Sequence, residues 1–169
     1  MKHLFLASTL FPAMACAQPG QSHVHGTGQL GITFSGAEYS LSLTVPAADI
    51  LGFEHQAETD EDRALVAGAI SALSEPLDLF LPPDEALCFA VSANVTLSQA
   101  GAEAEGSQEY HSEFRAEYQI QCQVIEEVDH IRFIYFERFQ RADKLTVFIE
   151  SAGAQKTHNV SRATPSLSF

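Results

Sequence analysis

Apolar and polar residues alternate with a period of two along most of this chain, and that pattern limits the fold more than any other feature. Residues 30–34 alternate Leu, Ile and Phe with small or polar residues, and residues 39–45 alternate Tyr, Leu and Val with Ser and Thr. Successive side chains of a strand point to opposite faces. The two segments, joined by the turn dipeptide Ser35-Gly36, therefore predict a β-hairpin with one buried face.

The same alternation predicts five further strands, over residues 87–97, 110–122, 131–136, 145–149 and 157–160. In the first of these, every second residue from Leu87 to Leu97 is apolar or Ala, so all of them are expected on one face of the sheet. There is no internal repeat, and strands do not alternate with helices as they do in a parallel sheet.

One main helix is predicted after the hairpin. Thr59 or Asp60 can cap it, and acidic residues follow in its first turn, where the helix dipole favours negative charge. Its apolar stripe consists of Leu65, Ala69, Ile70 and Leu73. Residues 47–57 have no periodicity and are expected to form a loop. The fold class that follows is α+β, a mostly antiparallel sheet with one main covering helix.

The first 17 residues have the composition of a secretory signal peptide. A short basic start precedes an apolar run, and Ala15-Cys16-Ala17 supplies the small residues that a signal peptidase reads. We expect cleavage after Ala17, with lipidation at Cys16 as the alternative, and a single exported domain over residues 18–169. No other stretch approaches the roughly 20 apolar residues of a membrane span.

Cys88 and Cys122 are the two cysteines that remain after the signal peptide. A pair of cysteines in an oxidising compartment predicts a disulfide. The alternative is that both thiolates bind zinc. Neither belongs to a CxxC motif, which argues against thioredoxin-like redox chemistry.

The chain is strongly acidic, with 22 Asp and Glu against 9 Lys and Arg and a net charge of −13. Such a surface repels nucleic acids and anionic lipids and attracts cations. Nucleic acid is therefore excluded as a partner. The charge does not identify a cation, and solubility alone explains most of it.

Histidines provide the metal-binding signal. His23 and His25 are two residues apart, so in an extended segment both rings project from one face and can reach the same ion. His55 follows Glu54 in the loop after the hairpin, and His111 lies on the polar side of its strand. His130 and His158 have no partner in the pattern and are expected at the surface. The candidate metal ligands are His23, His25, Glu54, His55 and His111.

No catalytic motif accompanies these ligands. The sequence has no HExxH helix, no Gly-x-Ser-x-Gly elbow and no phosphate-binding glycine loop. A zinc hydrolase would need an open coordination position and a general base, and no residue pattern supplies the base. The expectation is that the protein is not an enzyme.

Four phrases together resemble the ZrgA family, periplasmic zinc-binding proteins of Gram-negative bacteria. They are residues 23–30 (HVHGTGQL), 45–55 (VPAADILGFEH), 85–88 (EALC) and 136–139 (FERF), and they recur in order over almost the whole mature chain. The resemblance implies a periplasmic role in zinc acquisition or homeostasis beside envelope transport components. The family motif His-x-His-Gly falls on His23 and His25, Gly-Phe-Glu-His falls on His55, and His111 opens the strand that ends in Cys122.

One departure from the family affects how many zinc ions the protein is expected to bind. Members such as ZrgA itself carry a long insertion rich in His and Asp before that strand, whereas the acidic loop at residues 99–109 is short and contains no His. One or two ordered zinc sites are therefore expected. The alternative hypothesis is a non-catalytic interaction subunit of an envelope complex without a physiological metal, in which His23 and His25 only position an edge strand.

Overall fold

The computed structural model describes residues 26–100, 111–151 and 153–169. Within these ranges the strands form a six-stranded sheet of order β4-β5-β2-β1-β7-β8 and a three-stranded sheet of order β3-β6-β9. None of the helices in these ranges is long and apolar enough to cross a membrane. The strands are β1 (Thr27–Ser35), β2 (Glu38–Pro46), β3 (Phe80–Leu81), β4 (Cys88–Ala100), β5 (His111–Cys122), β6 (His130–Phe133), β7 (Lys144–Ser151), β8 (Ala154–Ser161) and β9 (Ser166–Ser168).

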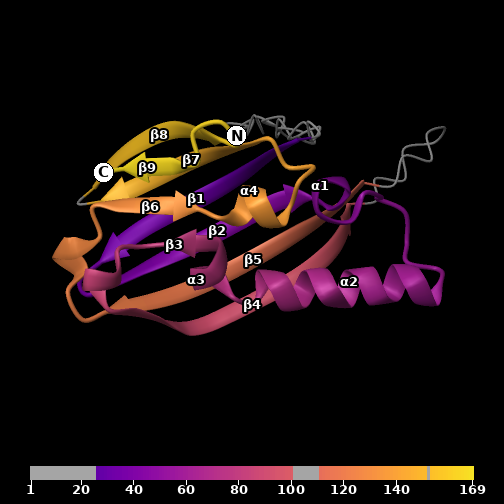
Figure 1. Ribbon diagram of the computed structural model, residues 1–169, viewed down its shortest axis with the longest axis horizontal. Helices are drawn as coiled ribbons and strands as arrows, with labels where there is room; N and C mark the ends of the chain where they lie inside the picture. Colours follow the sequence, from indigo (N-terminus) through magenta and orange to yellow (C-terminus); the bar gives the residue numbers. More distant parts are fainter. Residues whose placement is uncertain (1–25, 101–110, 152) are drawn as a thin grey trace, which may run out of the picture.

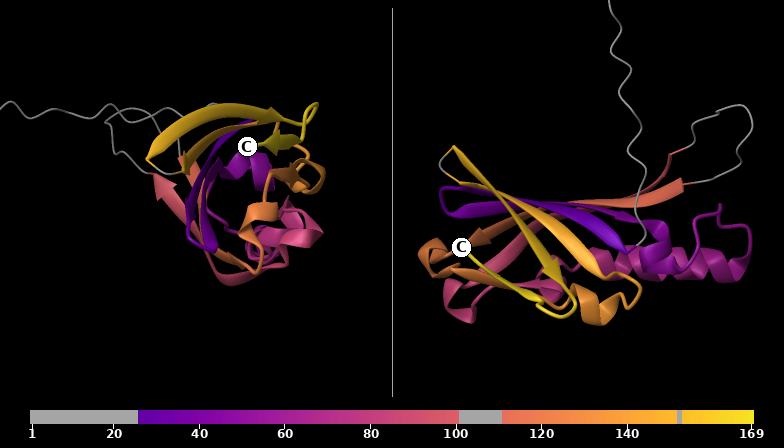
Figure 2. Two further views of the ribbon diagram at one scale, coloured as in Figure 1. Left: turned by 90° about the vertical axis from the view of Figure 1, so that its left-hand side faces the viewer. Right: turned by 90° about the horizontal axis from the view of Figure 1, so that it is seen from above.

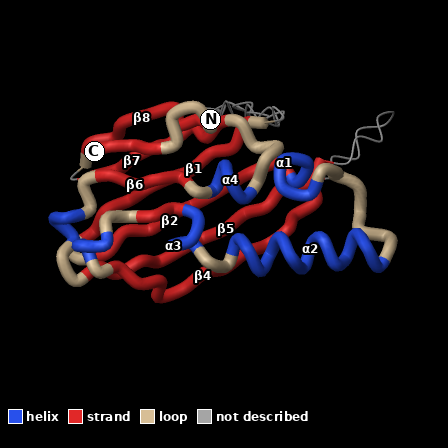
Figure 3. The backbone as a smooth tube through the Cα atoms, viewed as in Figure 1, coloured by secondary structure: helices blue, strands red, loops and turns tan. Residues whose placement is uncertain are grey.

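The helices are short except for α2, and they lie on one side of the larger sheet (Figures 1 and 3). The fold is α+β and mostly antiparallel, as predicted. Only β1 and β7 pair in parallel among the described strands. The helices are α1 (Ala47–Leu51), α2 (Asp60–Leu73), α3 (Pro76–Leu79) and α4 (Tyr135–Arg138), with 3-10 turns at Asp84–Ala86 and Ile125–Glu127.

The predicted hairpin is the centre of the larger sheet. β1 and β2 pair in antiparallel register, with Leu30 opposite Leu43 and Ile32 opposite Leu41, and Gly36 makes the turn at φ +63°. These inward side chains are fully buried. The sheet is strongly curved, and its concave face is closed by the helices and by the smaller sheet (Figure 2).

The main helix begins where the sequence predicts. Thr59 Oγ1 accepts a hydrogen bond from Asp62 N, and the Asp62 carboxylate accepts one from Thr59 N, which is a complete capping box. The hydrogen bonds that the Asp62 carboxylate accepts from Thr59 lower its pKa. At the other end, Leu73 is buried and its carbonyl accepts a hydrogen bond from the Tyr118 hydroxyl.

The predicted apolar stripe of this helix is only partly buried. Leu65 is 48% exposed, whereas Ala69 and Leu73 are buried. The reason is visible in Figure 1, where the first half of α2 extends past the ends of the strands.

Two predicted boundaries were wrong. The expected loop at residues 47–57 begins with α1, because Ala47 and Asp49 turn inward and are both buried. The expected strand at 131–136 ends at Phe133 and is followed by α4. Tyr135 and Phe136 are both buried, and adjacent residues can pack into one core from a helical turn but not from a strand, where they point to opposite faces.

The predicted face of β4 was also wrong at its beginning. The register with β5 shifts between Ala90 and Ser92, so Val91 is the extra residue of a β-bulge. The bulge reverses the alternation, so Val95 and Leu97 face the core while Phe89 faces outward and is 48% exposed.

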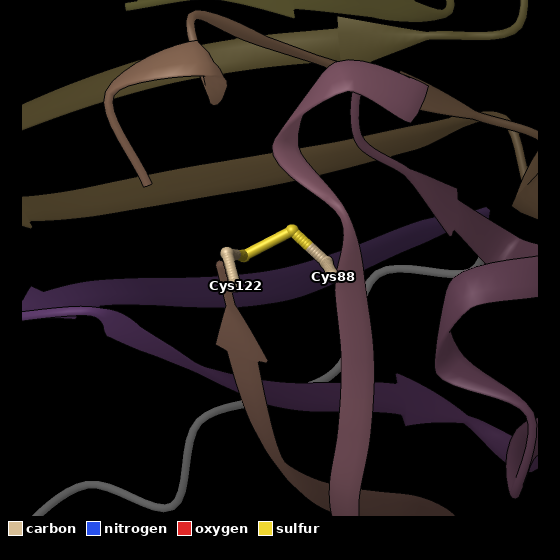
Figure 4. Close-up of a disulfide and its surroundings, with 2 residues drawn as sticks. All are labelled: Cys88 and Cys122. Carbon is tan, nitrogen blue, oxygen red and sulfur yellow. A yellow bond between two sulfur atoms is a disulfide. The ribbon is translucent and has the colours of Figure 1, made fainter. Parts of the chain in front are cut away.

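Cys88 and Cys122 lie directly opposite each other on β4 and β5, and they form a disulfide (Figure 4). Their Cα atoms are 3.9 Å apart. The predicted disulfide is confirmed, and neither sulfur is present as a thiolate that could bind zinc.

Gly28 is required by packing at the start of β1. An added Cβ would lie 2.4 Å from Val45 Cγ1 and 2.8 Å from Leu145 Cδ2. We therefore expect Gly28→Ala to lower the free energy of unfolding by about 1–3 kcal/mol, the usual cost of overpacking. Urea denaturation measures this. Gly31→Ala is the matched control, because its Cβ would meet nothing closer than 3.7 Å, and a similar loss in both variants would contradict the packing argument.

The disulfide closes a loop of 34 residues. Loop-closure entropy predicts that replacing both cysteines by Ser lowers the free energy of unfolding by about 4 kcal/mol. Urea denaturation of the double variant, beside the oxidised wild type, measures the loss. A double variant as stable as the wild type would contradict this prediction.

Candidate metal site

Glu54 is placed by the turn that ends α1. Gly52 has φ +88° and its amide donates to the Ala48 carbonyl, which caps the helix. The Arg141 guanidinium lies against Gly52, where an added Cβ would be 2.9 Å from Cζ. Glycine is therefore required at position 52 for two reasons. The positive φ is unfavourable for other residues, and the Arg141 guanidinium leaves no room for a Cβ. The turn directs the next three residues toward the beginning of β5.

Glu54 and His111 meet at that point, although 57 residues separate them in the sequence. The distance from Glu54 Oε2 to His111 Nδ1 is 3.2 Å. Ser112 Oγ donates to the Glu54 carbonyl at 2.8 Å, which fixes the loop on the strand. The Glu54 side chain is 15% exposed and that of His111 is 42% exposed, so the pair lies at the surface with the carboxylate partly covered.

His55 is held differently. Its ring stacks on Phe53, with centroids 4.5 Å apart and planes 15° apart, and its Nδ1 lies 2.9 Å from the Gln56 carbonyl oxygen. Across residues 26–100, 111–151 and 153–169, no three His, Cys, Asp or Glu side chains form a group that could hold a metal ion. The structure therefore brings Glu54 and His111 together but does not add His55 to them.

His23 and His25 lie outside the described residues, so their metal-binding role stays a prediction. Gly26 follows His25 directly and is described. Its amide donates to the buried Asp49 Oδ1 at 2.8 Å, and its carbonyl accepts from Asp143 N and Lys144 N at 3.0 and 2.9 Å. The beginning of β1 is thereby fixed against α1 and β7.

Buried polar side chains are concentrated at this end of the sheet. In the described part of the chain, the buried polar or charged residues are Asp49, Ser112 and Glu113. The Glu113 carboxylate accepts a hydrogen bond from Arg115 Nε at 2.5 Å. Burial of polar groups is costly unless they are hydrogen-bonded, so their gathering here indicates an organised polar site rather than ordinary core.

An open pocket of about 340 Å³ lies between α1 and the start of β1. It is lined by Gly26, Ala48, Asp49, Gly52, Arg141 and Asp143.

Sequence reasoning missed Asp49 and Ser112. A signal existed for Asp49, which is a single acid within the otherwise apolar stretch 45–51. Ser112 carries no such signal, because its role depends on the distant Glu54.

The two remaining histidines lie elsewhere. His130 Nδ1 is 2.7 Å from Asp129 Oδ1 at the beginning of β6, and that carboxylate is 77% exposed. His158 lies on the edge strand β8. Both are partly exposed, as expected for surface histidines.

Comparison with known proteins gives one result. No curated protein sequence matches the chain significantly. The family model described as "ZrgA family zinc uptake protein" matches residues 22–169, a range that includes all five candidate ligands as well as both cysteines. The chain therefore belongs to the ZrgA family of zinc uptake proteins.

Proposed function

We propose that this protein is a periplasmic, non-catalytic accessory protein that binds Zn²⁺ at the end of the sheet where Glu54 and His111 meet. The observation that carries the proposal is the 3.2 Å approach of a carboxylate oxygen to an imidazole nitrogen across 57 residues of sequence. Because the chain belongs to a zinc uptake family, we interpret this contact as part of a zinc site.

The distance suits two ligands of one zinc ion. Zinc binds imidazole nitrogen and carboxylate oxygen at about 2.0–2.1 Å in tetrahedral geometry, which places two ligand atoms about 3.3 Å apart. Glu54 Oε2 and His111 Nδ1 are separated by 3.2 Å. The pair can thus bind zinc with little rearrangement.

We propose His25 as the third ligand. Gly26 is fixed beside α1, and β2 separates β1 from β5 in the sheet. Two strand spacings of about 4.8 Å put the start of β1 about 10 Å from the start of β5. His25 directly precedes Gly26 in the sequence, and this adjacency is the support for proposing it as a ligand. His23 or water completes the shell in this proposal, and His55, whose Nδ1 lies 2.9 Å from the Gln56 carbonyl oxygen, is not part of it.

The surroundings support cation capture and release. The net charge of −13 raises the local concentration of cations, and the disulfide is suited to an oxidising compartment. Imidazole must be neutral to bind zinc, so acidification would release the ion.

His111→Ala is the direct test. We expect the wild type to retain one zinc ion after mild chelation in native mass spectrometry, and the variant to lose it, with affinity in competition titration lowered tenfold or more because a direct ligand is removed. His25→Ala should have an effect of the same size. His130→Ala is the matched control, since it removes a histidine that also contacts a carboxylate, Asp129.

If His111→Ala binds zinc as tightly as His130→Ala, the proposed site is wrong. If the wild type retains no zinc at all, the evidence moves to the interaction subunit without a physiological metal. Glu54→Gln separates two roles of the carboxylate. The amide can still accept a hydrogen bond from His111 but is a poor zinc ligand, so a large loss of affinity identifies Glu54 as a direct ligand.

A further inference from the structure

Asp49 is the acidic residue of the short helix α1, and its side chain is almost fully buried. It is 4% exposed, and the other residues of α1 are Ala, Ile and Leu. Removing a carboxylate from water is costly unless it is hydrogen-bonded. Asp49 Oδ1 accepts a hydrogen bond from Gly26 N at 2.8 Å, across 23 residues of sequence. An apolar side chain would serve packing as well, so this contact distinguishes Asp49 from an ordinary core residue.

Gly26, the residue that Asp49 holds, is fixed from two sides. Its carbonyl oxygen accepts hydrogen bonds from Asp143 N and Lys144 N at 3.0 and 2.9 Å. Its φ of +78° lies in the left-handed region, and an added Cβ would be 3.1 Å from Asp143 Oδ2. Of these three hydrogen bonds to the Gly26 backbone, only the one to Asp49 uses a side chain. It is therefore the one that a substitution can remove.

The same helix also leads to Glu54. Gly52, in the left-handed conformation, ends α1 three residues after Asp49. Asp49 and Gly52 line one open pocket together with Gly26. Beyond Gly52 the chain reaches Glu54, whose carbonyl accepts a hydrogen bond from Ser112 Oγ at 2.8 Å. Helix α1 thus connects the start of β1 on one side with the Glu54 loop on the other.

We propose that Asp49 is a positioning residue of the zinc site, which acts on His25 through Gly26. This role of Asp49 rests on the proposed function, in which His25 and Glu54 are ligands of one ion. A peptide unit is planar, so the hydrogen bond that orients Gly26 N also orients the peptide bond that joins it to His25. Without that hydrogen bond, more of the binding free energy is spent on ordering His25. Asp49 itself contributes no ligand atom, and its Oδ1 accepts from Gly26.

A double-mutant cycle tests this route. The affinity for Zn²⁺ is measured by competition with a chromophoric chelator in the wild type, Asp49→Ala, His25→Ala and the double variant. We expect Asp49→Ala to weaken the affinity about tenfold, the lower end of the range for loss of a group that orients a ligand. In the His25→Ala background the same substitution should change the affinity less than about twofold, because the ligand on which it acts is absent.

Two further variants of Asp49 separate positioning from folding. Asp49→Leu fills the buried position with an apolar side chain of similar size, so it is expected to fold and to weaken zinc binding as much as Asp49→Ala. Asp49→Asn keeps an oxygen that can accept from Gly26 N. It should therefore bind zinc more tightly than Asp49→Ala, because the proposed role belongs to the hydrogen bond.

Tyr118→Phe is the matched control. It removes another buried hydrogen bond of 2.8 Å, from the Tyr118 hydroxyl to the Leu73 carbonyl. It should lower the free energy of unfolding of the metal-free protein, measured with urea, without changing the affinity for zinc. An equal loss of zinc affinity in Tyr118→Phe and Asp49→Ala would show a general effect of stability and overturn the positioning role.

The remaining outcomes separate this inference from the proposed function. If the wild type binds one zinc ion and Asp49→Ala and Asp49→Leu bind it as tightly, the positioning role is wrong and the proposed function stands. If the wild type retains no zinc, both are wrong. An equal loss in the His25→Ala background also overturns the positioning role, because Asp49 would then be a direct ligand or act through another residue. So does an Asp49→Asn variant that binds zinc as weakly as Asp49→Ala.

Discussion

One-sided burial of the central strands is the constraint from which the rest of the structure follows. The inward residues of β1, β2 and β5 are almost completely buried, whereas their outward neighbours are small or polar. A slip of one residue would expose every buried side chain, so the register of these strands is determined by their hydrophobic pattern. That register sets Pro46 opposite Glu113 and brings the starts of β1 and β5 to the same end of the sheet. The position of the candidate site at that end of the sheet follows from this register.

At that end, polar contacts replace apolar packing. Asp49 holds Gly26, Ser112 holds the Glu54 backbone, and Glu113 contacts Arg115. The first contact joins the start of β1 to α1, the second joins the loop after α1 to β5, and the third lies within β5. Metal sites need ligands that are oriented by the groups behind them. In the proposed zinc site, Ser112 is the residue that holds the Glu54 backbone from behind.

Features that depend on neighbouring residues could be predicted from the sequence. The hairpin around Gly36, the Thr59 cap of α2 and the pairing of the two cysteines all follow from local pattern or from compartment. Features that depend on distant contacts could not. The bulge at Val91 has no signature in an unbroken apolar alternation, and the Glu54–His111 contact depends on how α1 docks. From the sequence, His55 and His111 mark their two segments as candidates for metal binding. The structure is needed to show that Glu54, and not His55, contacts His111.

The end of the sheet that carries the candidate site is also where β4 ends and β5 begins. Ala100 pairs with His111, so the last residue of β4 lies opposite the proposed ligand. Residues 101–110 contain no His, so the proposed zinc binding rests on the candidate ligands on either side of that segment.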